Sequence, residues 1–165
     1  MIKQDGMKSG DQEGRAFFLK MVGDYYRYMA ESATGDVLAK ARDGALQHYS
    51  EAETAAQGLN ACNPIKLGLA LNFSVFHYEV MQDNRRACIL AERALQEAMN
   101  KIDDVDEETF RDAKSIIELL KENLTLWKEE QEQVEENHED LWRGMVWASP
   151  PQKEWGRAEN YDVQV

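Results

Sequence analysis

The stretch LGLALNFSVFHYEV, residues 67–80, decides the fold. A helix of this sequence carries apolar side chains on nearly every side, which is typical of a helix enclosed by other helices. Leu69, Phe73, Phe76 and Val80 follow the spacing i, i+4, i+7, i+11, so we expect them to share one buried face. The stretch therefore predicts a central helix in a helical protein.

Two rows of residues combine aliphatic side chains with one asparagine. They comprise Leu71, Asn72, Val75 and Glu79 on the central helix and Ile116, Leu119, Asn123 and Leu126 on a later one. A buried face rarely holds an amide and a carboxylate without hydrogen-bond partners. One interpretation is an amphipathic groove that binds an extended peptide. The other is ordinary helix packing with satisfied core amides, and the pattern alone favours it.

The sequence on both sides of the central helix predicts an all-α fold of five helices. Between Arg15 and Glu129 the only proline is Pro64, where Asn63 and Pro64 form a helix start. No segment alternates with period two, and short connections favour antiparallel neighbours. The predicted helices span about 13–33, 37–57, 63–82, 85–101 and 107–128.

Composition divides the chain into three parts. We expect a polar extension over 1–12, a helical domain over 13–129, and an acidic tail with three tryptophans over 130–165. The charge run EEQEQVEENHED, residues 129–140, could extend the last helix or stay disordered. The remainder has no helical period and contains Pro150 and Pro151, so we treat 130–165 as a tail without fixed structure.

The net charge limits the partners. With 31 acids and 19 bases the chain carries a formal charge of −12, which disfavours nucleic acid and anionic membranes. No apolar run is long enough to span a bilayer, and the N-terminus lacks the apolar core of a secretory signal. Cys62 and Cys88 form no disulfide framework, so we expect buried thiols and a cytoplasmic protein.

A cluster of charged residues on the first predicted helix is the strongest candidate for binding chemistry. Lys20, Asp24 and Arg27 follow i, i+4, i+7 and share one face, with Tyr28 adjacent. An arginine fork, an ammonium group and a phenol could together hold a phosphate dianion. The alternative is a solvated row of ion pairs, which contributes little to stability and which the pattern alone favours.

Nothing in the sequence predicts catalysis. His48, His77 and His138 are scattered and show no metal-ligand spacing, and we expect no metal and no cofactor. A glycine-rich phosphate loop and a nucleophile elbow are both absent from the sequence.

Four stretches together resemble the 14-3-3 family. They are RAFFLKMVGDYYRYMAE (15–31), NPIKLGLALNFSVFHYE (63–79), RRACILAERALQEAMNKIDDVDEETFRDA (85–113) and IIELLKENLTLW (116–127). The resemblance covers about Arg15 to Lys128 in the family's order. It implies a non-enzymatic, all-helical adaptor that binds phosphoserine or phosphothreonine peptides, usually as a dimer.

The resemblance also implies roles for individual residues. Arg27 and Tyr28 resemble the family's phosphate ligands, and Lys20 resembles a further base of the same helix. Asn72 and Asn123 resemble the amides that hold the peptide main chain. The remaining matches are Leu71, Val75, Ile116, Leu119 and Leu126, which resemble the apolar wall, and Glu79, which resembles the acid that orients the bases.

This chain resembles only the last five of the family's nine helices. In the family, the first four carry the dimer interface and two further phosphate-binding bases, which cannot be assigned here. We therefore expect phosphorylated client proteins as partners and an impaired phosphate site, with other 14-3-3 subunits as further candidate partners although the helices of the family's dimer interface have no match here. The alternative is a helical scaffold of the tetratricopeptide type that ignores phosphorylation, although no clean 34-residue repeat occurs.

Overall fold

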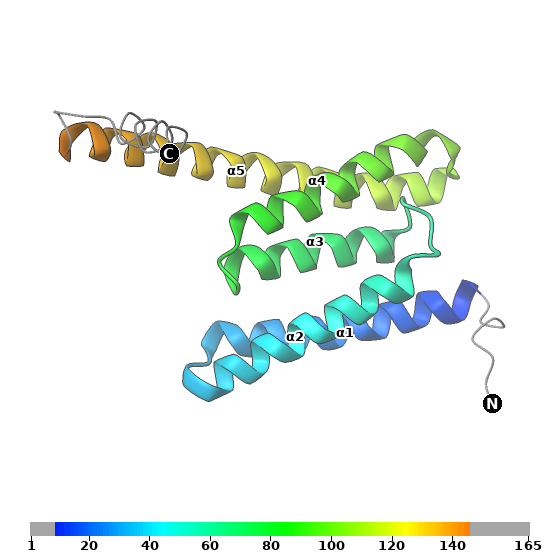
Figure 1. Cartoon of the computed structure of the whole chain (residues 1–165). Coiled ribbons are helices and arrows are strands. Elements are labelled where there is room, and N and C mark those ends of the chain that lie inside the picture. Colours follow the sequence, from blue (N-terminus) through cyan, green and yellow to red (C-terminus); the bar gives the residue numbers. More distant parts are fainter. Residues whose placement is uncertain (1–8, 146–165) are drawn as a thin grey trace, which may run out of the picture. The chain divides into compact units, whose positions relative to one another are not determined.

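The computed structural model describes residues 9–145, and these residues form helices and contain no strand (Figure 1). The elements are α1 (Ser9–Ser32), α2 (Gly35–Ala56), α3 (Pro64–Glu79), α4 (Asn84–Lys101), the short 3-10 helix η2 (Ile102–Asp104) and α5 (Glu107–Met145). The predicted all-α fold of five helices is thus confirmed. The chain divides between Trp127 and Lys128 into two units.

Side-chain caps fix where the central helices begin. Asn63 accepts a hydrogen bond from the backbone N–H of Ile65 at 2.9 Å, and Pro64 occupies the first turn of α3. Asp83 caps α4 in the same way, accepting from Arg86 N–H at 3.0 Å. Both starts agree with the sequence prediction, because each cap satisfies an amide that the first turn leaves without an intrahelical partner.

Helix α3 ends at Glu79, earlier than the predicted residue 82. Gln82 adopts a positive φ of 54°, a left-handed conformation that cannot continue a right-handed helix. The backbone N–H of Asp83 then donates to the carbonyl of His77 at 2.8 Å and closes the turn.

The first helix, predicted over about 13–33, begins earlier than predicted, because α1 starts at Ser9 within the polar extension. Contacts with the loop after α2 stabilise this first turn. Asn63 Nδ2 donates to Glu13 Oε1 at 3.5 Å, and Gln12 lies over Gly58. Polarity alone did not distinguish a solvated helical turn from a loop. Residues 1–8 lie outside the described part of the chain.

The predicted tail over 130–165 is corrected in its first part, because α5 continues to Met145. Seven of the sixteen added residues, 130–145, are Glu or Gln, which are good helix formers, and none of the sixteen is a proline. Of the two possibilities left open for the charge run, helix extension is therefore the observed one. The rest of the predicted tail, residues 146–165, lies outside the described residues.

One hydrophobic cluster joins α1, α2 and α3. Tyr49 of α2 is fully buried and stacks on Phe73 at 5.2 Å between ring centroids, with Phe76 at 5.6 Å. Gly23 of α1 permits this packing, since a Cβ there would lie 2.8 Å from the Tyr49 ring. The predicted buried face of the central helix is confirmed at Leu69, Phe73 and Phe76, and Val80 is partly buried.

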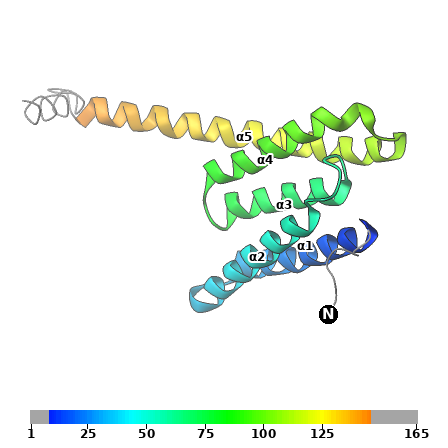
Figure 2. The same ribbon diagram turned by 45° about the vertical axis from the view of Figure 1, so that its right-hand side comes forward.

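A second cluster joins α3, α4 and the first part of α5. Trp127 is buried, stacks on Tyr78 at 4.9 Å, and its carbonyl accepts from Asn84 Nδ2 at 3.1 Å. Cys62 and Cys88 are buried free thiols in this cluster, as expected. In both views α3 lies between the α1–α2 pair and α4 (Figures 1 and 2), which explains its apolar side chains on opposite sides. No helix within residues 9–145 is apolar over a length sufficient to cross a membrane.

Candidate functional site

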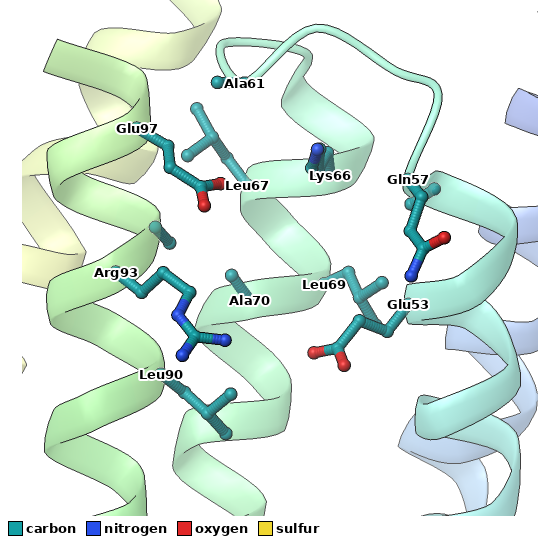
Figure 3. A pocket seen from close by; sticks show the side chains of 12 residues that line it. Glu53, Gln57, Ala61, Lys66, Leu67, Leu69, Ala70, Leu90, Arg93 and Glu97 are labelled. Atoms are coloured by element: carbon teal, nitrogen blue, oxygen red, sulfur yellow. The ribbon is translucent and has the colours of Figure 1, made fainter. Parts of the chain in front are cut away.

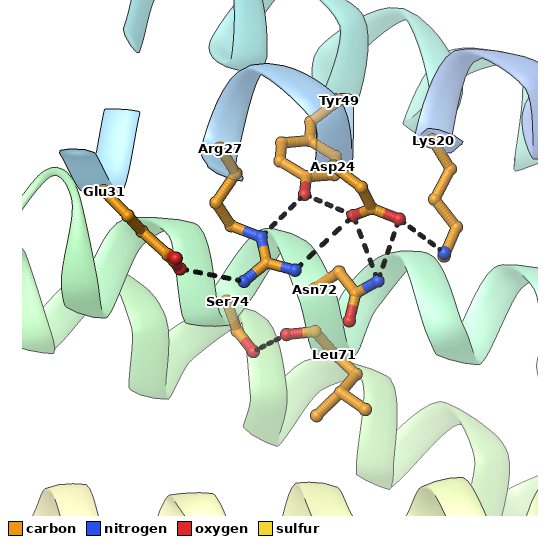
Figure 4. A network of polar contacts seen from close by, with 8 residues as sticks. All are labelled: Lys20, Asp24, Arg27, Glu31, Tyr49, Leu71, Asn72 and Ser74. Atoms are coloured by element: carbon orange, nitrogen blue, oxygen red, sulfur yellow. Dashed lines mark hydrogen bonds and ion pairs between the residues drawn. The ribbon is translucent and has the colours of Figure 1, made fainter. Parts of the chain in front are cut away.

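The carboxylate of Asp24 is the centre of a polar network between α1, α2 and α3 (Figure 4). Lys20 donates to Asp24 Oδ2 at 2.9 Å from one turn earlier on α1. From α3, Asn72 Nδ2 lies 3.1 and 3.2 Å from the two carboxylate oxygens. From α2, the hydroxyl of Tyr49 donates to Oδ1. Asp24 therefore fixes side chains from all three helices.

Arg27 lies against the same network and is only 8% exposed. Its Nε donates to the Tyr49 hydroxyl at 3.2 Å, and its terminal nitrogens lie 3.9 Å from carboxylate oxygens of Asp24 and Glu31. Its guanidinium carbon is 4.8 Å from the centre of the Tyr28 ring, a cation–π distance. These contacts hold the guanidinium in one place, so it is more than a solvated ion-pair partner.

Burial and hydrogen bonding shift the pKa values of Arg27 and Tyr49. Burial lowers the pKa of Arg27, but the bond to Tyr49 and the charge of Asp24 outweigh it, so the pKa is raised and the side chain stays cationic. Burial, followed by the bond to Asp24, raises the pKa of Tyr49. A neutral Tyr49 can accept from Arg27 and donate to Asp24 at once, which links the two charges.

Tyr49 is not among the residues predicted for the site, and Asp24 was predicted only to share a face with Lys20 and Arg27. A signal for Tyr49 does exist in the sequence. It occupies the buried register of α2 that is otherwise filled by small residues, namely Ala41, Ala45, Ala52 and Ala56. A single large polar aromatic residue in an alanine register indicates a side chain that reaches across to a neighbouring helix.

The four ionised groups of the network balance. Lys20 and Arg27 contribute two positive charges, and Asp24 and Glu31 contribute two negative charges. The network therefore carries no net charge and exerts little long-range attraction on an anion.

The predicted apolar residues lie on α3 and α5. Leu71, Val75 and Ile116 are half-buried and pack against the second hydrophobic cluster, so α3 and α5 contribute to one surface. Leu119 and Leu126 are 48% and 52% exposed. Ordinary helix packing accounts for the first three residues but leaves the two exposed leucines without an explanation.

The three remaining predicted residues differ in their surroundings. Asn72 is held by Asp24, and Asn123 is half-buried on α5. Glu79 is exposed at the end of α3, and in residues 9–145 no ion pair joins it to Lys20 or Arg27. In this structure Asp24 and Glu31, rather than Glu79, orient the bases.

A cavity of about 250 Å³ lies elsewhere, between α2, α3 and α4 (Figure 3). Leu67, Leu69 and Leu90 form part of its apolar lining, and Glu53, Arg93 and other charged residues surround it. None of the predicted site residues lines it. As for metal chemistry, residues 9–145 contain no group of three or more His, Cys, Asp or Glu side chains placed to hold an ion.

Sequence comparison connects this arrangement with known proteins. Residues 1–128 match the sequence profile of the 14-3-3 protein family. A 14-3-3 protein homolog of Encephalitozoon cuniculi is 49% identical over 120 residues, which are 73% of this chain and 46% of the relative. The 14-3-3 protein 2 of Entamoeba histolytica is 50% identical over 115 residues, which are 70% of this chain and 48% of the relative.

A third relative carries a functional name. The checkpoint signal transducer rad24 of Schizosaccharomyces pombe is 46% identical over 121 residues, which are 73% of this chain and 45% of the relative. The chain thus spans slightly less than half the length of these three relatives. The extent and identity of the matches agree with the resemblance seen in the sequence. The chain belongs to the 14-3-3 family.

Proposed function

We propose that this protein is a non-enzymatic adaptor that binds phosphoserine- or phosphothreonine-containing segments of client proteins. The phosphate would contact Arg27, Tyr28 and Lys20 on α1. The peptide main chain would bond to Asn72 and Asn123. Its side chains would lie against the apolar residues of α3 and α5, which are Leu71, Val75, Ile116, Leu119 and Leu126, with Glu79 at the end of α3.

The single observation that carries the proposal is the buried Asp24–Tyr49–Arg27 network. It holds a cationic guanidinium at a fixed position beside Asn72, and a planar arginine fork matches phosphate geometry. Preorganised donors bind better than flexible ones because less conformational entropy is lost on binding. Family membership and the signalling role in the name of one relative support the adaptor class.

We further propose that phosphate binding is weak in this chain. Glu31 and Asp24 already neutralise the two local bases, Lys20 and Arg27, so an incoming phosphate would compete with two carboxylates for the same donors. A charge-assisted hydrogen bond contributes about 1.5–3 kcal/mol. Competition for one such bond lowers affinity on the order of 10- to 10²-fold, since about 1.4 kcal/mol corresponds to a factor of ten.

A row of exposed apolar side chains on α1 supports pairing with a second 14-3-3 chain. Phe17, Phe18, Met21 and Tyr25 are each at least 50% exposed. Large exposed apolar patches mark interaction surfaces in soluble proteins. We propose that the protein acts in the cytoplasm, in keeping with its membership of the 14-3-3 family.

The proposal is tested by titrating two labelled peptides that differ only in phosphorylation of one serine. Fluorescence anisotropy should show tighter binding of the phosphorylated peptide. Val75→Asp should weaken both peptides at least tenfold, because it places a carboxylate among the apolar side chains of α3 and α5.

A matched variant controls for nonspecific effects. Val37→Asp adds the same charge at an exposed valine of α2 that is 55% exposed and outside the proposed site, and it should leave both affinities unchanged. Equal binding of the two peptides would remove the phosphate-reading function and favour a scaffold that ignores phosphorylation. If Val75→Asp binds both peptides as tightly as Val37→Asp does, the peptide must bind at another surface.

A further inference from the structure

The distal part of α5, residues 128–145, has an apolar row that the proposed peptide site does not use. Val134, His138, Leu141 and Met145 follow i, i+4, i+7, i+11 and therefore lie on one side of the helix. The three aliphatic members are strongly exposed, at 66%, 63% and 78%. We call these four residues the distal α5 row. Trp142 lies beside it, 6.3 Å from the His138 ring.

The distal α5 row continues the register of residues that are buried earlier in the same helix. Ile117 and Leu120 precede His138 and Leu141 by three heptads, and Trp127 precedes Val134 by one heptad. A heptad spacing of apolar residues is typical of a helix that packs lengthwise against another helix. The described residues of the second unit all belong to α5, which cannot cover its own face.

The rest of this segment is acidic. Residues 128–145 contain seven acids and two bases, a formal charge of −5. Glu132 and Glu136, Glu135 and Glu139, and Glu136 and Asp140 are like-charge pairs at i, i+4. The like charges of such pairs repel each other and destabilise the helix. A cationic partner would reduce this repulsion more than dissolved salt does, because its charges would lie directly beside the carboxylates.

We propose that the distal α5 row is a docking surface for a basic amphipathic helix of a partner protein. The partner's aliphatic side chains would cover Val134, Leu141 and Met145, and its lysines or arginines would lie near Glu135 and Glu139. A second copy of this chain is disfavoured because two segments of charge −5 would face each other. Anionic membranes and nucleic acids are repelled for the same reason.

The test uses the full chain and a synthetic peptide of about three heptads, with leucine at the two core positions and lysine at the flanking positions. Binding followed by anisotropy should weaken as salt is raised, because the attraction is partly electrostatic. The double variant Val134→Ser, Leu141→Ser should bind at least about tenfold more weakly, since it removes two buried aliphatic contacts.

Two controls separate the apolar contact from charge. Val37→Ser with Met99→Ser changes two residues of unit 1 that are 55% and 48% exposed, and it should leave peptide binding unchanged. A second peptide with serine in place of every leucine keeps the same charge and should bind at least tenfold more weakly. Equal binding of the two peptides, or of the protein and its double variant, would overturn the proposal.

The oligomeric state gives a further outcome. If the chain alone forms a dimer that is lost in Val134→Ser, Leu141→Ser, the row belongs to a second copy and the basic-partner proposal is wrong. Binding of phosphorylated peptides is measured on the same variants and is expected to be unchanged. Loss of basic-peptide binding and loss of phosphopeptide binding can therefore be distinguished.

Discussion

Tyr49 on α2 donates its hydroxyl proton to Asp24 on α1, and in the same position it accepts a hydrogen bond from Arg27 Nε at 3.2 Å. The phenol therefore links an acid and a base that lie 3.9 Å apart. Asp24 and Arg27 also have other polar partners, but Tyr49 is the side chain that hydrogen-bonds to both of them. The ring of Tyr49 also belongs to the hydrophobic cluster, so the site and the core share one side chain.

Tyr49→Phe should destabilise the fold while leaving its packing in place. The change removes only the hydroxyl, so Arg27 and Asp24 each lose one hydrogen bond at a buried position. We expect a loss of about 1–3 kcal/mol in the free energy of unfolding, measured by urea denaturation. Tyr25→Phe, at a tyrosine that is 64% exposed, is the matched control and should change stability by less than about 0.5 kcal/mol. Identical unfolding curves for the two variants would contradict the role of the hydroxyl.

Glu31→Gln should strengthen binding of a phosphorylated peptide. Glu31 lies 3.9 Å from Arg27 and is about half exposed, and its removal gives the network a net positive charge. Exposed ion pairs contribute about 0.2–1 kcal/mol, so we expect up to about a fivefold gain in affinity by anisotropy. Asp43→Asn removes one negative charge from an exposed position of α2 and should have a smaller effect. An equal gain in both variants would show that only the overall charge matters.

His77 should make stability dependent on pH. Burial lowers its pKa, with a further contribution from Arg86, and its Nδ1 is buried without a hydrogen-bond partner among the described residues. The unfolded chain therefore binds more protons than the folded one, so stability falls as pH drops below about 6.5, the ordinary histidine pKa. Between pH 7.5 and pH 5.5, a range of about two units around that pKa, the midpoint temperature of unfolding should fall more for the native sequence than for His77→Phe. Parallel pH profiles would assign the pH dependence to other groups.

The exposed row on α1 should cause the chain alone to self-associate. Phe18 and Met21 are 57% and 50% exposed, and burial of such side chains is favourable by about 1.5–3 kcal/mol each. Sedimentation velocity should show an average molecular mass that rises with protein concentration. The double variant Phe18→Ser, Met21→Ser should have a lower average mass at the same concentration. Val134→Ser with Leu141→Ser serves as the control on α5. A monomer at every concentration would contradict this assignment of the α1 surface.

The helices could be predicted from the sequence because their apolar patterns and start signals lie within the helices themselves or directly beside them. The apolar character of residues 67–80 identified the central helix, and Asn63 with Pro64 located its start. The misplaced ends have a tertiary or compositional cause. The first turn of α1 is accompanied by contacts of Gln12 and Glu13 with the loop after α2. The acidic run after Trp127 is helical although its residues are mostly exposed.

The site was predictable only in part. Lys20, Asp24 and Arg27 share a face that spacing alone can identify. Spacing within one helix cannot show which residues of other helices meet that face, so Tyr49 was missed and the contact of Asn72 with Asp24 was not predicted. Helical periodicity also cannot show which members of one row are half-buried and which are exposed, as Ile116 and Leu119 illustrate.

Arg27 is the residue through which we propose that this protein recognises phosphate. The most direct measurement is the ratio of the dissociation constants for the unphosphorylated and phosphorylated forms of one peptide, in the native sequence and in Arg27→Lys. Lysine keeps the charge but loses the planar fork. We predict a ratio well above one for the native sequence and a fall of about tenfold or more in the variant, with helicity retained by circular dichroism. A ratio near one for the native protein, or the same ratio in a folded Arg27→Lys variant, would contradict the account.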